Sequence, residues 1–384
     1  MSPLKRILVS ARDPASLQAV QQLLPALAQQ YSVRLWLQSP AFDIWCEGEF
    51  QVEGIEVEQV TLKDWSDGIS KERWLKESAL RDKLQACSPD LVLTGVSGPG
   101  VGVDEALLLF SRELGIASLA LQTFWGGFNS ELDALPDYAL VIDDGAVQMN
   151  AATYPEITCF AVGSLRHAPY QSLDVEARRA ELRNDFPICN KTLVLWLGQP
   201  LWQVEGYLKT QQVFADFLHR KIEETSESYY LLYRAHPKED SEQVAVVHQL
   251  LQDSIPGCWQ DVSKHSFVDC LLLADMVVSC FSSGGFDNVC LNEKTTQPFS
   301  STLYLFFDPT IREWFHRYSH LEEIPVVSEE FALAVTSKEQ FADRFAEAMD
   351  DSVRLTLGHN AKLHLPPADY AVEKSMEVIC RLMT

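Results

Sequence analysis

The chain has 384 residues, of which 47% are hydrophobic and 22% are charged, and its formal net charge at pH 7 is −23. This apolar content excludes an intrinsically disordered chain, and the length predicts two or three domains. The negative charge argues against broad binding to nucleic acid or to an anionic membrane, because both need a basic face. A small anionic ligand remains compatible, since a pocket sets its own local potential.

Cysteine usage and hydropathy indicate the compartment. The chain has nine cysteines, and none forms a C-x-x-C pair, which argues against a zinc ribbon or a redox motif. The odd number fits a reducing compartment. The first apolar run soon reaches Arg12 and Asp13, so we expect no signal peptide. No apolar stretch approaches the ~18 residues of a membrane span. We therefore expect a cytoplasmic protein that is not an integral membrane protein, with its oligomeric state left open.

Short apolar runs alternate with helical patterns in the first half of the chain. Strands are expected at residues 7–9, 33–37, 91–95, 116–121 and 138–142. Helices are expected at residues 14–30, 80–86 and 104–114, and the first of these places its leucines on one face. Strands that alternate with helices predict a parallel sheet covered on both faces.

The alternation pauses at a polar, charged segment, residues 169–185, and then starts again. Strands are expected at residues 192–197, 229–235 and 276–280. Helices are expected at residues 207–222, 242–251 and 267–273, with a last helix from about residue 369 to residue 383. The predicted fold class is α/β, with two Rossmann-like doubly wound domains that face a cleft.

Ligands of open α/β sheets bind at the carboxyl ends of the strands, so the loops there carry the candidate sites. Ser282-Ser283-Gly284-Gly285 follows an expected strand and opens a helix. Free backbone N–H groups and the helix dipole would favour a phosphate at this point, and the serine hydroxyls would add donors. The alternative is that one of the two serines merely caps the helix.

Two further loops of the second half are candidates for phosphate binding. Arg234-Ala235-His236-Pro237-Lys238 lies just past a strand, so His236 could donate to a phosphate and Arg234 could pair with one. The alternative is a surface turn with solvated charges. Gly198 and Gln199 end the first strand of this half, where a glycine allows a ligand to approach closely. A plain turn is the alternative there.

Three carboxylates of the first half are candidates for a catalytic base. Asp104 and Glu105 begin a helix, where acidic residues are also expected simply because of the helix dipole. Asp144 belongs to an adjacent acidic pair at a strand end, which could instead be a solvated turn. The glycines of Gly98-Pro99-Gly100-Val101-Gly102 have the wrong spacing for a dinucleotide fingerprint, so we reject NAD binding.

Aromatic residues also follow a strand of the first half. Trp125 and Phe128 lie beside glycines, and as exposed rings they would suit stacking against a sugar or an acceptor. The alternative is that both rings pack in the core. The sequence shows no cluster with metal-ligand spacing, so we expect neither a metal nor a cofactor.

The layout and three short motifs resemble the GT-B-fold glycosyltransferase superfamily. Val162-Gly163-Ser164 is similar to the strand end that precedes the interdomain linker in that superfamily. His236-Pro237 resembles the His-Pro motif of bacterial sialyltransferase-like and capsule-type enzymes, and the resemblance implies that His236 contacts the donor phosphate. Ser282-Ser283-Gly284-Gly285 is similar to the Ser-Gly-Gly of UDP-GlcNAc 2-epimerases, which share the fold.

This resemblance implies a glycosyltransferase that moves a sugar from a nucleotide-sugar donor to a glycan, lipid-linked or protein acceptor, inverting and without a metal. The alternatives are a sugar-nucleotide 2-epimerase and a catalytically inactive GT-B-like binding protein. The implied domains are residues 1–168 on the acceptor side and residues 189–365 for the nucleotide sugar, with residues 169–188 as linker. Residues 366–384 would form a closing helix that packs on the first domain.

Overall fold

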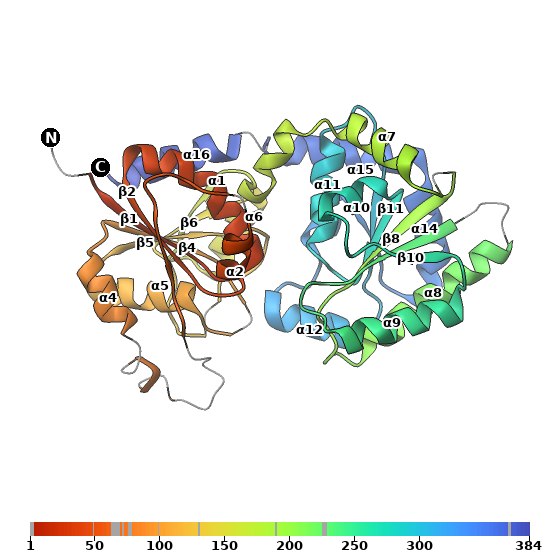
Figure 1. Cartoon of the computed structure of the whole chain (residues 1–384), viewed down its shortest axis with the longest axis horizontal. Helices are drawn as coiled ribbons and strands as arrows, with labels where there is room; N and C mark the ends of the chain where they lie inside the picture. The colour runs from red at the N-terminus through yellow and green to blue at the C-terminus, as the bar shows by residue number, and fades with distance from the viewer. Residues whose placement is uncertain are drawn as a thin grey trace. The chain divides into compact units, whose positions relative to one another are not determined.

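The structure is a computed structural model. It describes residues 4–48, 50–62, 70, 73–75, 79–98, 100–129, 131–188, 190–224, 229–367 and 370–384. Pro99, Cys189 and Asp369, which bear on the expectations above, lie outside these residues. The chain divides into two compact units: unit 1 is Met1–Gln171 with Leu365–Thr384, and unit 2 is Ser172–His364 (Figure 1). Limited proteolysis is the measurement that tests the domain limits expected from the sequence.

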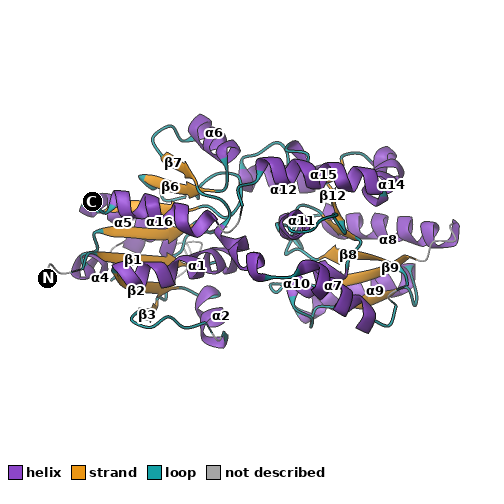
Figure 2. Cartoon of the chain, turned by 90° about the horizontal axis from the view of Figure 1, so that it is seen from above, coloured by secondary structure: helices purple, strands orange, loops and turns teal. Residues whose placement is uncertain are grey.

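Unit 1 is built on a seven-stranded sheet in the order β3-β2-β1-β4-β5-β6-β7, whose neighbouring strands are parallel (Figure 2). Its strands are β1 (Arg6–Ala11), β2 (Ser32–Leu37), β3 (Glu56–Gln59), β4 (Leu91–Gly95), β5 (Ala117–Leu121), β6 (Tyr138–Val141) and β7 (Thr158–Ala161). Its helices are α1 (Pro14–Gln30), α2 (Ala41–Glu47), α4 (Leu80–Cys87), α5 (Val103–Leu114), α6 (Asp144–Thr153) and α16 (Tyr370–Leu382). The 3-10 helix η1 (Leu165–Ser172) follows β7.

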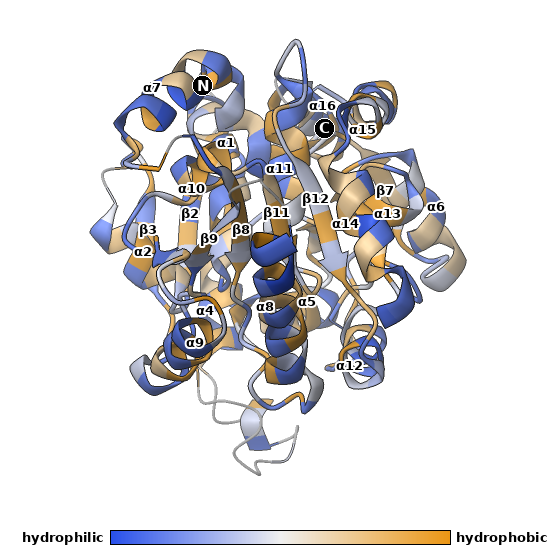
Figure 3. Ribbon diagram, turned by 90° about the vertical axis from the view of Figure 1, so that its right-hand side faces the viewer, coloured by the Kyte–Doolittle hydropathy of each residue, from blue (hydrophilic) through white to orange (hydrophobic). Residues whose placement is uncertain are grey.

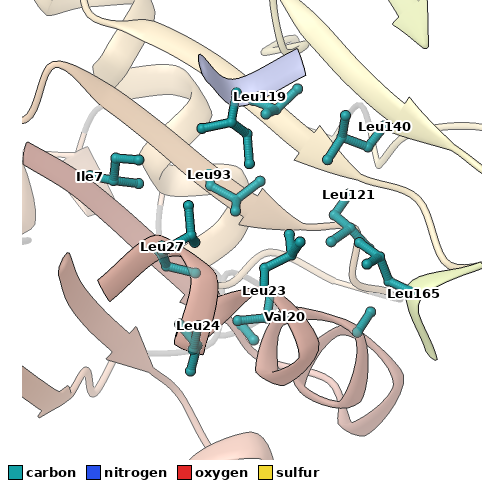
Figure 4. Close-up of a cluster of buried hydrophobic side chains, with 14 of the residues drawn as sticks. Ile7, Val20, Leu23, Leu24, Leu27, Leu93, Leu119, Leu121, Leu140 and Leu165 are labelled. Carbon is teal, nitrogen blue, oxygen red and sulfur yellow. The ribbon is translucent and has the colours of Figure 1, made fainter. Parts of the chain in front are cut away.

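Both faces of this sheet are buried. Alternate residues of β1 point to opposite sides, so Ile7 and Val9 join one apolar cluster and Leu8 joins the other. The first cluster includes the apolar face of α1, whose leucines recur every three or four residues (Figure 4). Helix α16 packs beside α1 and adds Ala371 and Ile379 to the same cluster (Figure 1). The prediction that the C-terminal helix returns to the first domain is therefore confirmed.

Unit 2 is built on a six-stranded parallel sheet in the order β10-β9-β8-β11-β12-β13. Its strands are β8 (Thr192–Leu197), β9 (Tyr229–Arg234), β10 (Trp259–Asp261), β11 (Met276–Ser279), β12 (Ser301–Leu305) and β13 (Leu333–Val335). Its helices are α7 (Val175–Asp185), α8 (Gly206–Glu224), α9 (Ser241–Ser254), α10 (Phe267–Leu273), α11 (Gly284–Glu293), α12 (Pro309–Ser319), α13 (Pro325–Ser328), α14 (Phe341–Met349) and α15 (Asp351–His364), with the 3-10 helix η2 (Lys338–Gln340) before α14.

The central strands of unit 2 are apolar and its helices are amphipathic. Figure 3 shows β8 and β11 in the hydrophobic colour and the outward face of α8 in the hydrophilic colour, while Phe214 and Leu218 of α8 are buried. Apolar strands covered by amphipathic helices are what a parallel sheet requires. The predicted fold class, α/β with two Rossmann-like domains, is confirmed.

The polar segment expected to link the domains contains α7. Its arginines form ion pairs within unit 2: Arg178 Nη2 lies 2.9 Å from Asp269 Oδ2, and Arg183 Nη2 lies 2.8 Å from Asp275 Oδ2. Arg179 Nη2 also reaches Asp275, at 2.6 Å from Oδ1. Much of the charge that marked this segment in the sequence therefore anchors α7 to unit 2.

Candidate functional site

Gln199 joins two of the predicted loops of unit 2. Its side-chain Oε1 accepts the backbone N–H groups of Cys280 and Phe281, each at 3.0 Å, and Gln199 is only 5% exposed. Its own backbone N–H donates to the Tyr207 hydroxyl at 2.6 Å. The loop after β8 is thus tied to the loop after β11 through the Gln199 side-chain oxygen. Gln199 therefore has a structural role, and its contact with a nucleotide stays a prediction.

Gly198 is required by the neighbouring turn. A Cβ atom at this position would lie 2.5 Å from Glu239 Oε2 and 3.1 Å from both the Arg234 carbonyl and the His236 nitrogen. The loop after β9 therefore approaches Gly198 closely, at the position where the sequence predicted the approach of a ligand.

His236 is held in a compact turn at the carboxyl end of β9. Its backbone N–H donates to Glu239 Oε2 at 2.6 Å, and its carbonyl accepts the Glu239 N–H at 2.9 Å. The Lys238 N–H donates to His236 Nδ1 at 3.1 Å. Burial, followed by the charge of Lys238, lowers the His236 pKa to about 4. The ring is therefore neutral at pH 7, and because Nδ1 accepts a hydrogen bond, Nε2 carries the proton.

Glu239 was not among the predicted site residues. Its carboxylate accepts the indole N–H of Trp202 at 2.8 Å, and the Tyr233 hydroxyl lies 3.5 Å away, in addition to the bond from His236. Burial raises the Glu239 pKa, while these hydrogen bonds lower it. The sequence shows only that an acidic residue lies three positions after His236. A solvated turn has the same charge pattern, so this pattern alone did not identify Glu239 as a site residue.

The Arg234 guanidinium contacts the segment that follows β10. Its Nη1 donates to the carbonyl of His265 at 2.7 Å and to that of Ser263 at 3.3 Å. The guanidinium lies 5.6 Å from the centroid of the Phe267 ring. Arg234 Nη1 therefore holds the loop after β10, and a phosphate contact by the same guanidinium stays a prediction.

Three backbone N–H groups of the Ser282–Gly285 segment, those of Ser282, Gly284 and Gly285, donate within this segment or to Ser279. The N–H of Ser282 donates to Ser279 Oγ at 3.1 Å, and the N–H of Gly284 donates to Ser282 Oγ at 3.2 Å. The N–H of Gly285 donates to the Ser282 carbonyl at 3.0 Å. These three N–H groups are therefore not the free donors that the sequence predicted at this turn. Ser282 and Ser283, both half-buried, are the members that retain solvent access.

The two glycines of this turn are required by packing. A Cβ atom on Gly285 would collide with the Tyr304 hydroxyl and lie 2.6 Å from Tyr304 Cζ and 2.7 Å from Thr302 Cγ2. A Cβ atom on Gly284 would lie 2.6 Å from Leu197 Cδ1. Both residues are buried. The glycines therefore let α11 approach the sheet, which accounts for both of them by packing, and phosphate binding at this turn stays a prediction.

The acidic pair of unit 1, Asp104 and Glu105, is buried, at 0% and 2% exposed. Asp104 accepts the Ser10 hydroxyl at 2.6 Å and the Arg12 backbone N–H at 3.1 Å. Glu105 accepts the Ser97 hydroxyl at 2.9 Å and the Gly102 backbone N–H at 2.7 Å, which caps α5. Burial raises the pKa of both side chains, that of Glu105 to about 7. Their carboxylates hold the loops after β1 and β4, and burial keeps them from a substrate.

Asp13, which the sequence analysis did not select, offers an accessible carboxylate at the same edge of the sheet. It follows β1, its side chain is 21% exposed, and its Oδ2 accepts the Gly98 N–H at 3.0 Å. An acidic residue between a strand and a helix is common as a helix cap, so its sequence position alone gave no reason to choose it.

The other candidates of unit 1 divide between buried and exposed. Asp143 caps α6 by accepting the Ala146 N–H at 2.7 Å, and it also accepts the Trp125 indole N–H at 3.1 Å. Asp144 is exposed at the start of the same helix. Trp125 and Phe128 are each 3% exposed, so they pack inside the unit and present no open ring face. The alternative of core packing is the one that the structure shows.

In the described part of the chain, the His, Cys, Asp and Glu side chains include no group of three placed to hold a metal ion. None of its helices combines the length and the apolar character that crossing a membrane requires.

Comparison with known proteins gives relatives by structure alone. No family model matches the sequence, and no curated protein matches it. S. aureus MnaA, solved with UDP, is 14% identical with a TM-score of 0.64, over 99% of this chain and 97% of that one. A UDP-GlcNAc 2-epimerase from Neisseria meningitidis bound to UDP-GlcNAc is 11% identical with a TM-score of 0.62, over 98% and 99%.

A UDP-glucosyltransferase from Polygonum tinctorium that glucosylates indoxyl is 11% identical with a TM-score of 0.61, over the full length of both chains. Identities this low establish the fold and nothing finer. The resemblance noted in the sequence is confirmed at that level: the chain has the two-domain GT-B fold that glycosyltransferases share with UDP-GlcNAc 2-epimerases.

Proposed function

We propose that this protein is a nucleotide-sugar-dependent glycosyltransferase whose unit 2 binds the donor through His236. The observation that carries the proposal is the state of that ring, which is neutral and half-buried, with its proton on Nε2 because Nδ1 is occupied. A fixed N–H donor at the carboxyl end of a central strand suits a phosphate oxygen. The hydroxyls of Ser282 and Ser283, at the end of β11, would add donors from a neighbouring loop.

The donor proposed here is a UDP-sugar. Of the structures that share the fold, MnaA was solved with UDP, the Neisseria meningitidis epimerase with UDP-GlcNAc, and the plant enzyme is a UDP-glucosyltransferase. These names support uridine as the first base to test. Because the fold likeness does not fix the nucleotide, GDP-, CMP- and dTDP-sugars belong in the same panel.

Asp13 is the residue that we propose as the general base. An inverting transfer requires a base that removes the proton of the acceptor hydroxyl. Asp104 and Glu105 are enclosed by hydrogen bonds and have no solvent access, whereas the Asp13 carboxylate is partly exposed. Asp144 is exposed as well, at the start of α6, and it is the alternative base that a matched substitution tests.

Binding is tested by thermal shift and calorimetry with the four classes of nucleotide sugar. A ligand at 100 times its dissociation constant stabilises the folded state by about 2.7 kcal/mol, which a melting curve resolves. His236→Ala should weaken UDP binding at least tenfold, the order expected for loss of a hydrogen bond to a charged group. His316→Ala, at an exposed position on α12, is the matched control. Equal affinities of wild type and His236→Ala would disprove the assignment.

Turnover separates transfer from epimerisation. UDP-GlcNAc incubated alone should remain unchanged, and sugar should leave the nucleotide only when an acceptor is present. Asp13→Asn should abolish that transfer while UDP affinity stays at the wild-type level, and Asp144→Asn should retain activity. Conversion of UDP-GlcNAc to its 2-epimer without an acceptor would replace the transferase proposal with the isomerase.

A further inference from the structure

The Glu239 carboxylate lies where two loops of unit 2 meet. One oxygen accepts the indole N–H of Trp202, from the loop after β8, and the other accepts the backbone N–H of His236, from the loop after β9. Gly198 makes this possible, because a side chain there would occupy the position of Glu239 Oε2. Glu239 is therefore a side-chain link between the two loops, in addition to the backbone bond from the Gly198 N–H to the Arg234 carbonyl at 2.8 Å.

The bonds around Glu239 determine how the His236 ring is oriented. The turn from His236 to Glu239 is closed in both directions, by the His236 N–H to the carboxylate and by the Glu239 N–H to the His236 carbonyl. Within this closed turn the Lys238 N–H reaches His236 Nδ1. If the carboxylate no longer held the turn, the Lys238 bond would lose its geometry and either ring nitrogen could carry the proton.

We propose that Glu239 is a positioning residue, which fixes His236 with its Nε2–H directed outward as a preformed donor for a nucleoside diphosphate. The nucleotide part of this inference rests on the proposed function, whereas the positioning part concerns the protein alone. Preorganisation of this kind lowers the entropy lost when a ligand binds.

The carboxylate cannot be replaced by an amide without a specific conflict. Both neighbours, Trp202 Nε1 and the His236 nitrogen, are donors, and each uses a different oxygen of Glu239. A glutamine has one oxygen and one NH2 group, so Glu239→Gln must set a donor against a donor at one of the two contacts. Trp202→Phe removes the indole donor, so the double variant Glu239→Gln/Trp202→Phe can again accept the His236 N–H through its amide oxygen.

The first experiment reads the His236 ring without any ligand. Nitrogen-15 NMR of histidine-labelled protein, with His236→Ala used for assignment, should show a single Nε2-protonated form in the wild type. Glu239→Gln should give a mixture of both tautomers, and Glu239→Gln/Trp202→Phe should restore the single form. Asp240→Asn is the control, since Asp240 lies next to this turn and its side chain caps α9 by accepting the N–H groups of Glu242 and Gln243. An unchanged tautomer in Glu239→Gln would overturn the inference.

The second experiment places the same variants in a binding cycle with UDP. Glu239→Gln should weaken UDP binding about tenfold in the wild-type background and hardly at all in His236→Ala, because the effect passes through that ring. Equal losses in both backgrounds would show that Glu239 acts elsewhere. If Glu239→Gln does not fold, Glu239→Asp withdraws the carboxylate from both donors and serves instead. A wild type that shows the predicted tautomer but binds no nucleotide refutes the proposed function and leaves the positioning role standing.

Discussion

Each unit has a glycine-containing turn at the same point of its sheet, after β4 beside β1 in unit 1 and after β11 beside β8 in unit 2. In unit 1 the turn is held by the carboxylate of Glu105, and the adjacent carboxylate of Asp104 holds the neighbouring loop after β1. In unit 2 the turn is held by uncharged groups, the side-chain amide of Gln199 and the hydroxyl of Ser282. An incoming anion would meet buried acids in the first case and uncharged dipoles in the second.

The comparison shows that topology does not decide which turn suits a phosphate. Both turns use backbone N–H groups to complete the loop itself, so ligand contacts are left to side chains such as His236. The charge of the groups that close the turn then favours unit 2 for an anionic donor. Substitutions in and around the two turns test this difference.

The largest expected effect comes from Gly285→Ala. Its methyl group would overlap the Tyr304 ring, and overpacking in a rigid core costs about 3 kcal/mol, the upper part of the usual range. Denaturant unfolding should show this loss. Gly98→Ala in the turn of unit 1 is the matched control, because no atom lies within 4 Å of its new methyl group, and it should change stability by less than ~0.5 kcal/mol.

Adding Tyr304→Phe removes the hydroxyl that the Gly285→Ala methyl would strike, so the double variant should regain part of the loss. A stable Gly285→Ala with weakened UDP binding would instead restore the view that this glycine makes room for the phosphate.

Glu105 should make the stability of the protein depend on pH. Its pKa is about 7 in the folded chain and near 4.5 when unfolded, so the folded state binds the proton more tightly. The stability that protonated Glu105 contributes is then fully present below about pH 4.5, and this contribution is lost as the pH rises through 7. With ~1.4 kcal/mol for each pH unit across that window, the loss is about 3 kcal/mol.

Glu105→Gln keeps an acceptor for the Gly102 N–H and removes the charge, so its unfolding free energy should vary less between pH 5 and pH 8 than that of the wild type. The measurement is a series of urea titrations across this range. Parallel curves for the two proteins would mean that Glu105 is ionised at little cost in the folded chain.

The smallest effect is expected from Arg234→Lys. A lysine lacks the guanidinium whose Nη1 donates to the carbonyls of Ser263 and His265, so the free energy of unfolding should fall by about 1 kcal/mol. UDP affinity should change much less than in His236→Ala. Strong loss of affinity at unchanged stability would show that Arg234 contacts the nucleotide after all.

Long, strongly periodic segments were predictable from the sequence. Helix α1 was expected at residues 14–30 and is found at Pro14–Gln30, and β8 was expected and found at residues 192–197. The strands β3, β10, β12 and β13 were missed. Three of them, β3, β10 and β13, have only three or four residues at a sheet edge and carry too little apolar pattern. Strand β12 is buried and has five residues, but it begins with the polar Ser301 and Thr302.

The loops were located correctly, but the structural contacts of several of their side chains were not predicted. Gln199, Arg234 and Gly285 all lie at carboxyl strand ends, as expected, yet each is used to join or pack neighbouring loops. Residues that serve as ligands and residues that support them have the same polarity and the same positions in a sequence, so only their contacts distinguish them.

The sequence by itself determined the alternation of strands and helices, because burial of both faces of a parallel sheet imposes continuous apolar strands and amphipathic helices. It also placed His236 at the end of β9. Only the tertiary structure decided that His236 is neutral with its proton on Nε2, that Asp104 and Glu105 are enclosed, and that Glu239 bridges two loops. Those properties arise from desolvation and from hydrogen bonds between segments far apart in the chain, which no local pattern records.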